Sequence, residues 1–230
     1  MSGDTGEMGL RERKKRRTYQ AISEAAIGLF LEKGFDKVSV AEVAAAAEIS
    51  KPTLFRYFPT KEDLVLHRFA DHEDESARVV AGRGEGVTPL AALRAHFLDG
   101  LERRDPVTGL NDHPAVLAFH RLLYGTPSLI ARAYGYQERS EKILAGALGE
   151  GVGAALGAGQ IFAVQRVLAM ENWRRIAAGE SADAVWPDAV EAAELGFRQL
   201  ERGLGAGTGG GSSEGASPTE GAGGSQGEGG

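Results

Sequence analysis

The feature that most constrains the fold of this chain is a pair of capping boxes placed close together near its N-terminus. Ser39 precedes Glu42 by three positions, and Thr60 precedes Asp63 by the same spacing. In a capping box the hydroxyl accepts a hydrogen bond from the backbone N–H three residues on, and the acidic side chain accepts one from the N–H of the capping residue. Each box therefore predicts the start of a helix, and the chain between the boxes has room only for short helices.

The segment between the boxes contains one more helix start. Ser50 is a capping residue, and Pro52 fits the first turn because the N–H that proline lacks would have no partner there. Pro59 ends this helix. The elements predicted here are a helix over 39–47, a turn of Glu48 and Ile49, and a helix over 51–58.

Apolar residues recur at helical spacing along most of the remaining chain, with little of the alternation typical of strands. Ile22, Ala26 and Phe30, for example, share one face of a helix over 13–33, which Gly34 ends. The sequence therefore predicts an all-α fold. Further helices are expected from the second capping box to about 80 and over 89–103, 114–124, 127–150, 159–178 and 184–202.

The two short helices joined by a tight turn predict a helix-turn-helix, whose second helix enters the major groove of DNA. Ala44 and Ala47 are small, as close packing of two helices requires. Lys51, Thr53 and Arg56 are left on the outer face of the second helix. Because the N-terminal residues of a recognition helix reach deepest into the groove, we expect base contacts from this end.

The predicted DNA contacts fall into three groups. Base edges are expected to meet Lys51, Pro52 and Thr53, flanked by Ser50 and Arg56. Phosphates are expected at Ser39, Tyr57 and Lys61, because helix N-termini and a rigid hydroxyl suit an anion. The basic run at 11–17, with Arg13, Arg16 and Arg17 as its main contacts, can neutralise phosphates or reach the flanking minor groove.

The charge of the chain is distributed unevenly. The total is −6, yet residues 11–61 carry 11 Lys and Arg against six Asp and Glu. This segment therefore has a balance of +5, which leaves −11 for the rest. The asymmetry indicates a nucleic-acid-binding head on an acidic body.

Composition excludes several classes of protein. The chain has no cysteine, so a disulfide framework, a thiolate metal site and a cysteine nucleophile are excluded. The N-terminus lacks the apolar region of a signal peptide, and no uninterrupted apolar run is long enough for a membrane span. We expect a cytoplasmic protein without a membrane partner.

Both ends of the chain differ in composition from its middle. Residues 205–230 include 12 Gly and no aromatic residue, Leu, Ile or Val, so they cannot bury a core. The predicted organisation is a disordered N-terminal arm over 1–10, a DNA-binding domain over 11–59, a helical domain over 60–204 and a disordered Gly-rich tail over 205–230.

The stretch SVAEVAAAAEISKPTLFRYFPTKEDL, residues 39–64, resembles the DNA-binding domain of the TetR family of bacterial regulators. A generic helix-turn-helix does not require the sequence FRYF followed by KEDL, and the resemblance extends back to about Arg13. It implies operator contacts for Ser39, Lys51, Thr53, Tyr57 and Lys61. Glu48 departs from the glycine of many members, which predicts left-handed backbone strain of roughly 1 kcal/mol.

Beyond residue 65 the resemblance extends only to the arrangement of helices along the chain. It implies a C-terminal effector-binding and dimerisation domain, a homodimer through the last two helices, double-stranded palindromic operator DNA as partner and a small-molecule effector. Aromatic and polar side chains interleave in this part, as they do in ligand pockets. The candidate pocket residues are His96, Phe97, Phe119, His120, Tyr124, Tyr136, Phe162, Gln165 and Trp173.

The function expected from these observations is a repressor that an effector releases from its operator. An activator, or a regulator without an effector, would use the same head, and an interaction protein could use the basic arm without sequence specificity. A metal-assisted enzyme could use the cluster at 67–75, where His67 and Asp71 share a helix face. Solvent-facing acidic residues explain most of that cluster and are the stronger interpretation, and no HExxH, GxSxG or phosphate-loop motif is present. We therefore expect no enzyme activity, no metal and no cofactor.

Overall fold

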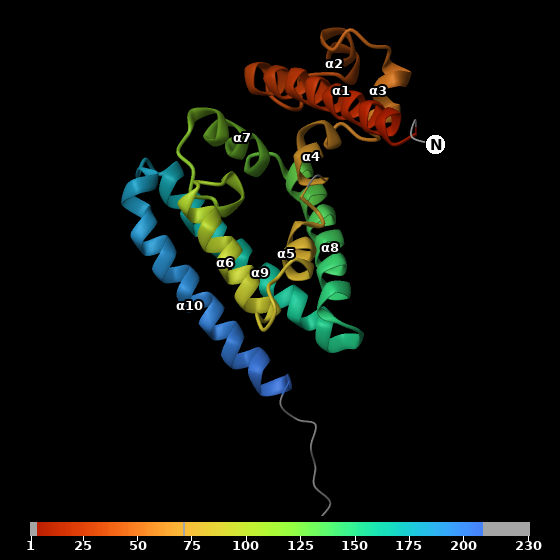
Figure 1. Ribbon diagram of the computed structural model, residues 1–230. Coiled ribbons are helices and arrows are strands. Elements are labelled where there is room, and N and C mark those ends of the chain that lie inside the picture. The colour runs from red at the N-terminus through yellow and green to blue at the C-terminus, as the bar shows by residue number, and fades with distance from the viewer. Residues whose placement is uncertain (1–3, 71, 209–230) are drawn as a thin grey trace, which may run out of the picture.

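The structure is a computed structural model that describes residues 4–70 and 72–208 (Figure 1). The described residues form ten α-helices and one short 3₁₀ helix, without a strand, so the all-α prediction is confirmed. The helices are α1 (Asp4–Lys33), α2 (Val40–Ala46), α3 (Lys51–Tyr57), α4 (Asp63–Ala70), α5 (Glu75–Ala81), α6 (Pro89–Glu102), η1 (Pro106–Thr108), α7 (Pro114–Tyr124), α8 (Pro127–Leu148), α9 (Gly151–Ala177) and α10 (Ala182–Thr208).

The predicted single helix after the second capping box was wrong. The chain forms α4, then a turn at 72–74, and then α5, which begins at Glu75. Asp and His have weaker helix propensity than Glu, Lys or Leu, and the sequence DHED at 71–74 concentrates them. The link between the N-terminal and C-terminal helices therefore consists of two short helices rather than one long helix.

Helix ends differ from the prediction at three other places. α1 begins at Asp4 rather than 13, so residues 4–10 are helical where a disordered arm was expected. Glu7, Met8 and Leu10 in this stretch have good helix propensity. α9 begins at Gly151 rather than 159, because its Ala-rich sequence continues the helix despite several glycines, and α10 extends to Thr208, into the predicted tail. The rest of that tail, 209–230, lies outside the described residues.

The N-terminal helices pack around one core. Ile22, Ala26 and Phe30 of α1 contact Val43 of α2 and Leu54 of α3 in a single buried cluster. The same cluster includes residues of three later helices: Leu64, Val65 and Leu66 of α4, Leu123 of α7, and Leu129 and Tyr136 of α8. We call α1–α3 the head, and its core therefore continues into α7 and α8.

The second core lies among α6, α9 and α10, which form most of the body below the head (Figure 1). Phe97 of α6 and Phe197 of α10 face each other with ring centroids 6.0 Å apart. Gly109 follows η1 with φ of +72°, and a Cβ there would lie 1.9 Å from the Ala169 carbonyl oxygen of α9. Only glycine can make this approach, which holds the loop after α6 against α9.

α9 is the most apolar long helix. By length and composition alone it could span a membrane, although Gln160, Gln165 and Arg166 interrupt its apolar sequence. Only 22% of its apolar stretch is buried within the described protein. Val152, Leu156 and Val167 are more than half exposed, so one face of α9 is left uncovered by the other described residues.

Candidate nucleic-acid interface and effector region

α3 has the geometry of a recognition helix. The Ser50 hydroxyl accepts a hydrogen bond from the backbone N–H of Thr53 at 3.3 Å and lies 2.8 Å from the Thr53 hydroxyl. Leu54 and the C-cap Phe58 are buried, which fixes the orientation of the helix on the head. Ser50, Lys51, Pro52 and Arg56 remain exposed, and Thr53 is half-buried.

α2 begins with the predicted capping box. The Glu42 N–H donates to the Ser39 hydroxyl at 3.2 Å, and the Ser39 N–H donates to the Glu42 carboxylate at 2.8 Å. These bonds, with Lys33 nearby, hold the pKa of Glu42 below its usual value. The Ser39 hydroxyl also lies 2.9 Å from the same carboxylate, so it is oriented at the start of α2.

Tyr57 is held by an aromatic cluster. Its ring meets Tyr19 of α1 edge to face at 4.9 Å, and Tyr19 also packs against Phe58 and stacks on His67. The guanidinium of Arg56 lies 5.8 Å from the Tyr57 ring. The cluster ties α3 to α1 and to α4, and it places Tyr57, half-buried, at the edge of the recognition helix.

Lys61 contacts the end of α1 and the loop that follows it. Its ammonium donates a hydrogen bond to the Phe35 carbonyl oxygen at 2.5 Å and lies 4.3 Å from the Phe35 ring centroid. It is also 5.5 Å from the Phe30 ring. Lys61 therefore stabilises this loop, and its contact with a phosphate stays a prediction.

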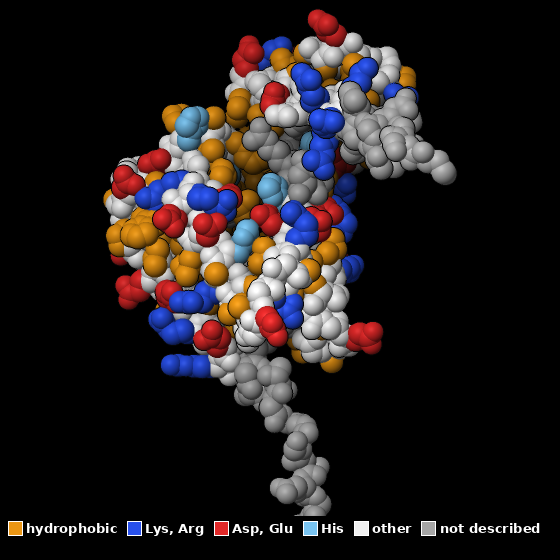
Figure 2. Space-filling view, viewed as in Figure 1, with side chains coloured by type: hydrophobic (Ala, Val, Ile, Leu, Met, Phe, Trp, Pro, Cys, Tyr) orange, Lys and Arg blue, Asp and Glu red, His pale blue; other side chains and the backbone are white. Residues whose placement is uncertain are grey.

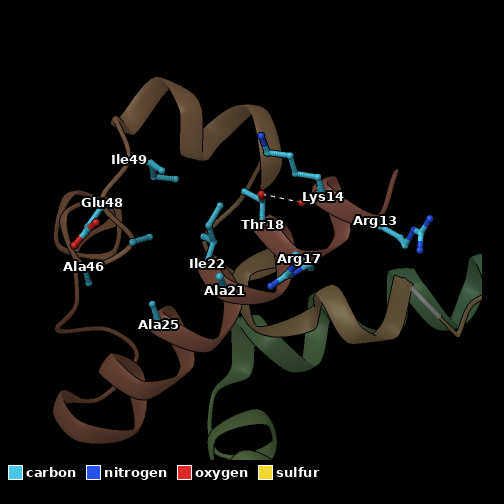
Figure 3. Close-up of a pocket in the computed structure, with 11 residues that line it drawn as sticks. Arg13, Lys14, Arg17, Thr18, Ala21, Ile22, Ala25, Ala46, Glu48 and Ile49 are labelled. Carbon is cyan, nitrogen blue, oxygen red and sulfur yellow. Dashed lines mark hydrogen bonds between the residues drawn. The ribbon is translucent and has the colours of Figure 1, made fainter. Parts of the chain in front are cut away.

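The turn between α2 and α3 carries the expected strain, because Glu48 has φ of +54°. A groove of about 920 Å³ separates this turn from α1 (Figure 3). Arg13, Lys14 and Arg17 line its α1 side, and Glu48 and Ile49 line the other. Residues 13–17 are all exposed, and Figure 2 shows Lys and Arg side chains gathered on the head.

An ion pair joins α4 to α8. Arg132 of α8 donates two hydrogen bonds to the Asp63 carboxylate at 2.8 and 3.2 Å, and the Tyr136 hydroxyl donates a third at 3.1 Å. Burial opposes the charge on Asp63, yet the bonds from Arg132, Thr60 and Tyr136 outweigh it and hold the pKa of Asp63 below its usual value. Burial and the neighbouring carboxylate raise the pKa of Tyr136 to about 12, so it remains a donor.

A second pair reinforces this contact. Arg139, about two turns after Arg132 along α8, donates to Glu73 in the turn between α4 and α5 at 2.7 and 2.9 Å. Its guanidinium also lies 4.3 Å from the Tyr136 ring. α8 therefore holds the link at both ends of α4.

Four of the nine candidate pocket residues lie together. His120 and Tyr124 of α7 and Trp173 of α9 form an aromatic cluster, with the Tyr124 and Trp173 ring centroids 4.7 Å apart and Phe119 beside His120. His120 Nδ1 and Trp173 Nε1 are buried, and no hydrogen-bond partner for either is found among the described residues. Burial lowers the pKa of His120, which keeps the ring neutral, and burial together with Tyr134 raises the pKa of Tyr124.

The other five candidates lie apart from this cluster. Phe97 and Phe162 pack in the body core, and Tyr136 is bonded to Asp63. His96 Nε2 lies 3.3 Å from Glu75, which also contacts His72 at 2.7 Å, and Gln165 is half-buried on α9. In the part of the chain that is described, no group of three or more His, Asp and Glu side chains is placed to hold a metal.

A family model described as bacterial regulatory proteins, tetR family, matches residues 22–67. The matched segment covers the last 12 residues of α1, all of α2 and α3, and the first five residues of α4, and so includes the capped helix α3. Over this segment, a fifth of the chain, the protein is similar to the bacterial regulatory proteins of the tetR family.

Curated relatives match over parts of their length. The HTH-type transcriptional regulator TcmR of Streptomyces glaucescens is 34% identical over 136 residues, which is 59% of each chain. The fatty acid metabolism regulator protein of Bacillus subtilis is 30% identical over 59 residues, or 26% of this chain and 30% of that protein. The matched region is thus less than two thirds of either relative.

Solved structures share the fold. NalD of Pseudomonas aeruginosa, described as the secondary repressor of a multidrug efflux pump, has a TM-score of 0.53 at 18% identity, covering 79% of this chain and 97% of NalD. GusR of Salmonella enterica has a TM-score of 0.51 at 19% identity, with 82% and 96% covered. A complex of SmeT with triclosan has a TM-score of 0.53 at 14% identity, with 81% and 91% covered.

Two contacts between distant parts of the chain were missed by sequence reasoning. Asp63 was recognised as a capping residue but not as the acceptor for Arg132, which lies 69 positions further along the chain. The pairing of His120 with Trp173 was also missed, although both were candidates. The only local signal for the first was an acidic cap followed by two arginines, Arg132 and Arg139, at helical spacing in a later helix.

Proposed function

We propose that this chain is a sequence-specific repressor of the TetR family that binds a palindromic operator as a homodimer in the cytoplasm and is released by a small-molecule effector. The exposed N-terminal turn of α3 is the observation that carries the proposal. Lys51, Pro52 and Thr53 lie there on a helix fixed by a cap, two buried side chains and an aromatic cluster. Such a helix presents donors and acceptors to base edges without further ordering.

The flanking residues support backbone contacts. Arg13, Arg16 and Arg17 are exposed on α1, Arg56 is exposed on α3, and Tyr57 lies at its edge. Ser39 and Ser50 stand at helix N-termini, where phosphate binding is favoured. Lys61 donates one of its three ammonium hydrogens to the Phe35 carbonyl, which leaves two for a phosphate.

The uncovered face of α9 supports the homodimer. Val152, Leu156 and Val167 recur at helical spacing along it, and Leu195 of α10 is also more than half exposed. Ala155, Gly159 and Ala163 on α9 are small enough to let a second helix approach closely. A second copy that covers this face with its own α9 and α10 buries the apolar side chains and fixes the spacing of the two heads.

The contacts between head and body support release by an effector. α4 is held to α8 through Asp63 and Arg132, and α7 contributes Leu123 to the core of the head. A ligand that favours a different arrangement of α7 and α8 therefore changes the position of the head. By linkage, it weakens DNA binding by the same factor by which DNA weakens ligand binding. SmeT, which shares the fold, has been solved with triclosan bound.

The test is a gel-shift titration of the full chain against promoter DNA flanking its own gene, with excess non-specific competitor. A band that resists competitor is expected, and Lys51→Ala should weaken it by about 1–3 kcal/mol if Lys51 reads a base. Lys142→Ala, which removes an exposed lysine of α8 paired with Glu138, is the matched control and should leave the affinity unchanged.

Loss of the shift in competitor, or equal affinity of Lys51→Ala and the native chain, contradicts the proposed recognition helix. A reporter under the same promoter separates the two directions of regulation. Deletion of the gene should raise expression if the chain represses, whereas a fall in expression would identify an activator with the same head.

A further inference from the structure

α7 has two faces with different neighbours. Phe119, Leu122 and Leu123 pack against the core of the head, together with residues of α1 and α4. His120 and Tyr124 are four positions apart, on roughly the opposite face, and contact Trp173 of α9. α7 therefore lies between the DNA-binding head and the body helix α9.

The contact between α7 and α9 leaves two polar atoms without partners. His120 is 8% exposed, yet its Nδ1 has no hydrogen bond to any described residue, and neither has the buried Nε1 of Trp173. Almost all buried polar atoms in folded proteins are hydrogen-bonded, so an unpaired one calls for an explanation. The two unpaired atoms belong to rings whose centroids are 6.4 Å apart, one ring on each helix. They indicate a position for a ligand atom.

The chemistry of the two atoms limits the ligand. Indole Nε1–H can only donate, so it requires an acceptor, and neutral His120 can donate from Nδ1 to the same kind of atom. The walls are the flat rings of Tyr124 and Trp173. The cluster itself contains no charged side chain, so an ion buried there would lose its hydration without compensation.

Building on the proposed function, we propose that the effector binds between His120, Tyr124 and Trp173 and is an uncharged, ring-bearing molecule with a hydrogen-bond acceptor oxygen such as a carbonyl. Its oxygen accepts from Trp173 Nε1 and His120 Nδ1, and its rings stack on the aromatic walls. Tyr124, which is 36% exposed, forms the outer edge through which the ligand enters.

Binding at this position acts on the head through α7. The Tyr124 and Trp173 rings are already in contact, so a ligand that enters between them separates α7 from α9. The opposite face of α7 carries Phe119, Leu122 and Leu123, which pack in the core of the head. The separation is therefore transmitted to the position of α1 and α4.

The experiment uses three probes on the full chain. Chromone is uncharged and bicyclic with one ring carbonyl, naphthalene is a bicycle without an acceptor, and chromone-2-carboxylate carries a charge. Binding is measured by calorimetry for the native chain, Trp173→Phe, His120→Phe and the control Trp186→Phe, which removes the only other tryptophan, on α10. In Trp186→Phe, quenching of the remaining indole fluorescence reports binding at Trp173, and thermal unfolding checks that each variant is folded.

Chromone is expected to bind the native chain and Trp186→Phe about tenfold more tightly than either other probe and to quench Trp173. Trp173→Phe and His120→Phe should each weaken chromone binding by about 2- to 12-fold, as loss of one hydrogen bond implies, and leave naphthalene binding unchanged. The proposal is overturned if chromone does not bind, if the carboxylate or naphthalene binds equally well, or if folded Trp173→Phe keeps the native preference for chromone.

A gel shift on the same preparation separates this inference from the proposed function. Operator binding without chromone binding overturns the effector site and leaves the DNA-binding function intact. Chromone binding without operator binding supports the site as a ligand site and contradicts the function.

Discussion

Asp63 connects α4 to α8, because its carboxylate accepts hydrogen bonds from the Thr60 N–H at the start of α4 and from Arg132 and Tyr136 of α8. Asp63→Asn should lower the free energy of unfolding at pH 7 by about 2 kcal/mol, the typical value of a hydrogen bond to a charged group. Since the pKa of Asp63 is lowered on folding, this stabilisation is present above the unfolded-state pKa, near 3.9, and is lost as the pH falls through the lower, folded-state value.

Urea unfolding at pH 7 and in the acid range below pH 3 measures this prediction. The difference between the native chain and Asp63→Asn should shrink at the lower pH. Asp74→Asn is the control, because Asp74 makes an exposed ion pair with Arg78 whose loss should change stability by less than about 0.5 kcal/mol. A difference for Asp63→Asn that is the same at both pH values would contradict the ion-pair explanation.

His120→Phe is expected to stabilise the chain although it weakens ligand binding. His120→Phe removes a buried nitrogen without a hydrogen bond in the described chain and keeps a ring of similar shape, so the free energy of unfolding should rise by about 1 kcal/mol. His113→Phe is the matched control, because His113 Nδ1 accepts from the Ala115 N–H at the start of α7, and its loss should destabilise the chain by about 1 kcal/mol. Chemical denaturation of both variants tests the pair, and a destabilised His120→Phe would show that Nδ1 is satisfied in solution.

At the scale of elements, the turn between α2 and α3 is strained at Glu48, whose φ is +54°. Glu48→Gly should raise the free energy of unfolding by roughly 0.5–1 kcal/mol, because glycine adopts this conformation without the steric cost of a Cβ. Glu48→Ala keeps the Cβ and should give no such gain. Thermal unfolding of the two variants separates relief of backbone strain from loss of the exposed carboxylate.

The elements predicted well from sequence are those set by local signals. The box of Ser39 and Glu42, the cap at Ser50 and the left-handed turn at Glu48 each depend on residues a few positions apart, and each is present. The break between α4 and α5 was missed because helical spacing of apolar residues continues across it. The contact of Asp63 with Arg132 and that of His120 with Trp173 depend on the packing of distant helices, which no local pattern encodes.

At the scale of the whole molecule, the uncovered face of α9 should determine the oligomeric state. Val167→Glu puts a charge on that face and should convert the dimer to a monomer, because an unpaired charge in an apolar interface is costly. Val107→Glu, at an equally exposed position on η1, is the control and should leave the dimer intact. Sedimentation velocity measures the change, and a dimeric Val167→Glu would place the interface elsewhere.

Loss of the dimer should also weaken operator binding, because two linked heads bind two half-sites far more tightly than one head binds one. The uneven charge of the chain also favours operator binding through the heads. The positive head attracts phosphates and the acidic remainder does not, so a bound dimer is oriented with its heads toward DNA.

The buried cluster that contains Phe30 and Leu54 also contains Leu123, Leu129 and Tyr136, which come from the body. A head excised near residue 59 or 70 would expose apolar surface that α7 and α8 normally cover. The head therefore cannot be exchanged as an independent unit. A chimaera that joins it to the body of another regulator would need to carry the matching surfaces of α7 and α8. The proposed operator and effector specificities would then have to change together, or through variants that spare this shared core.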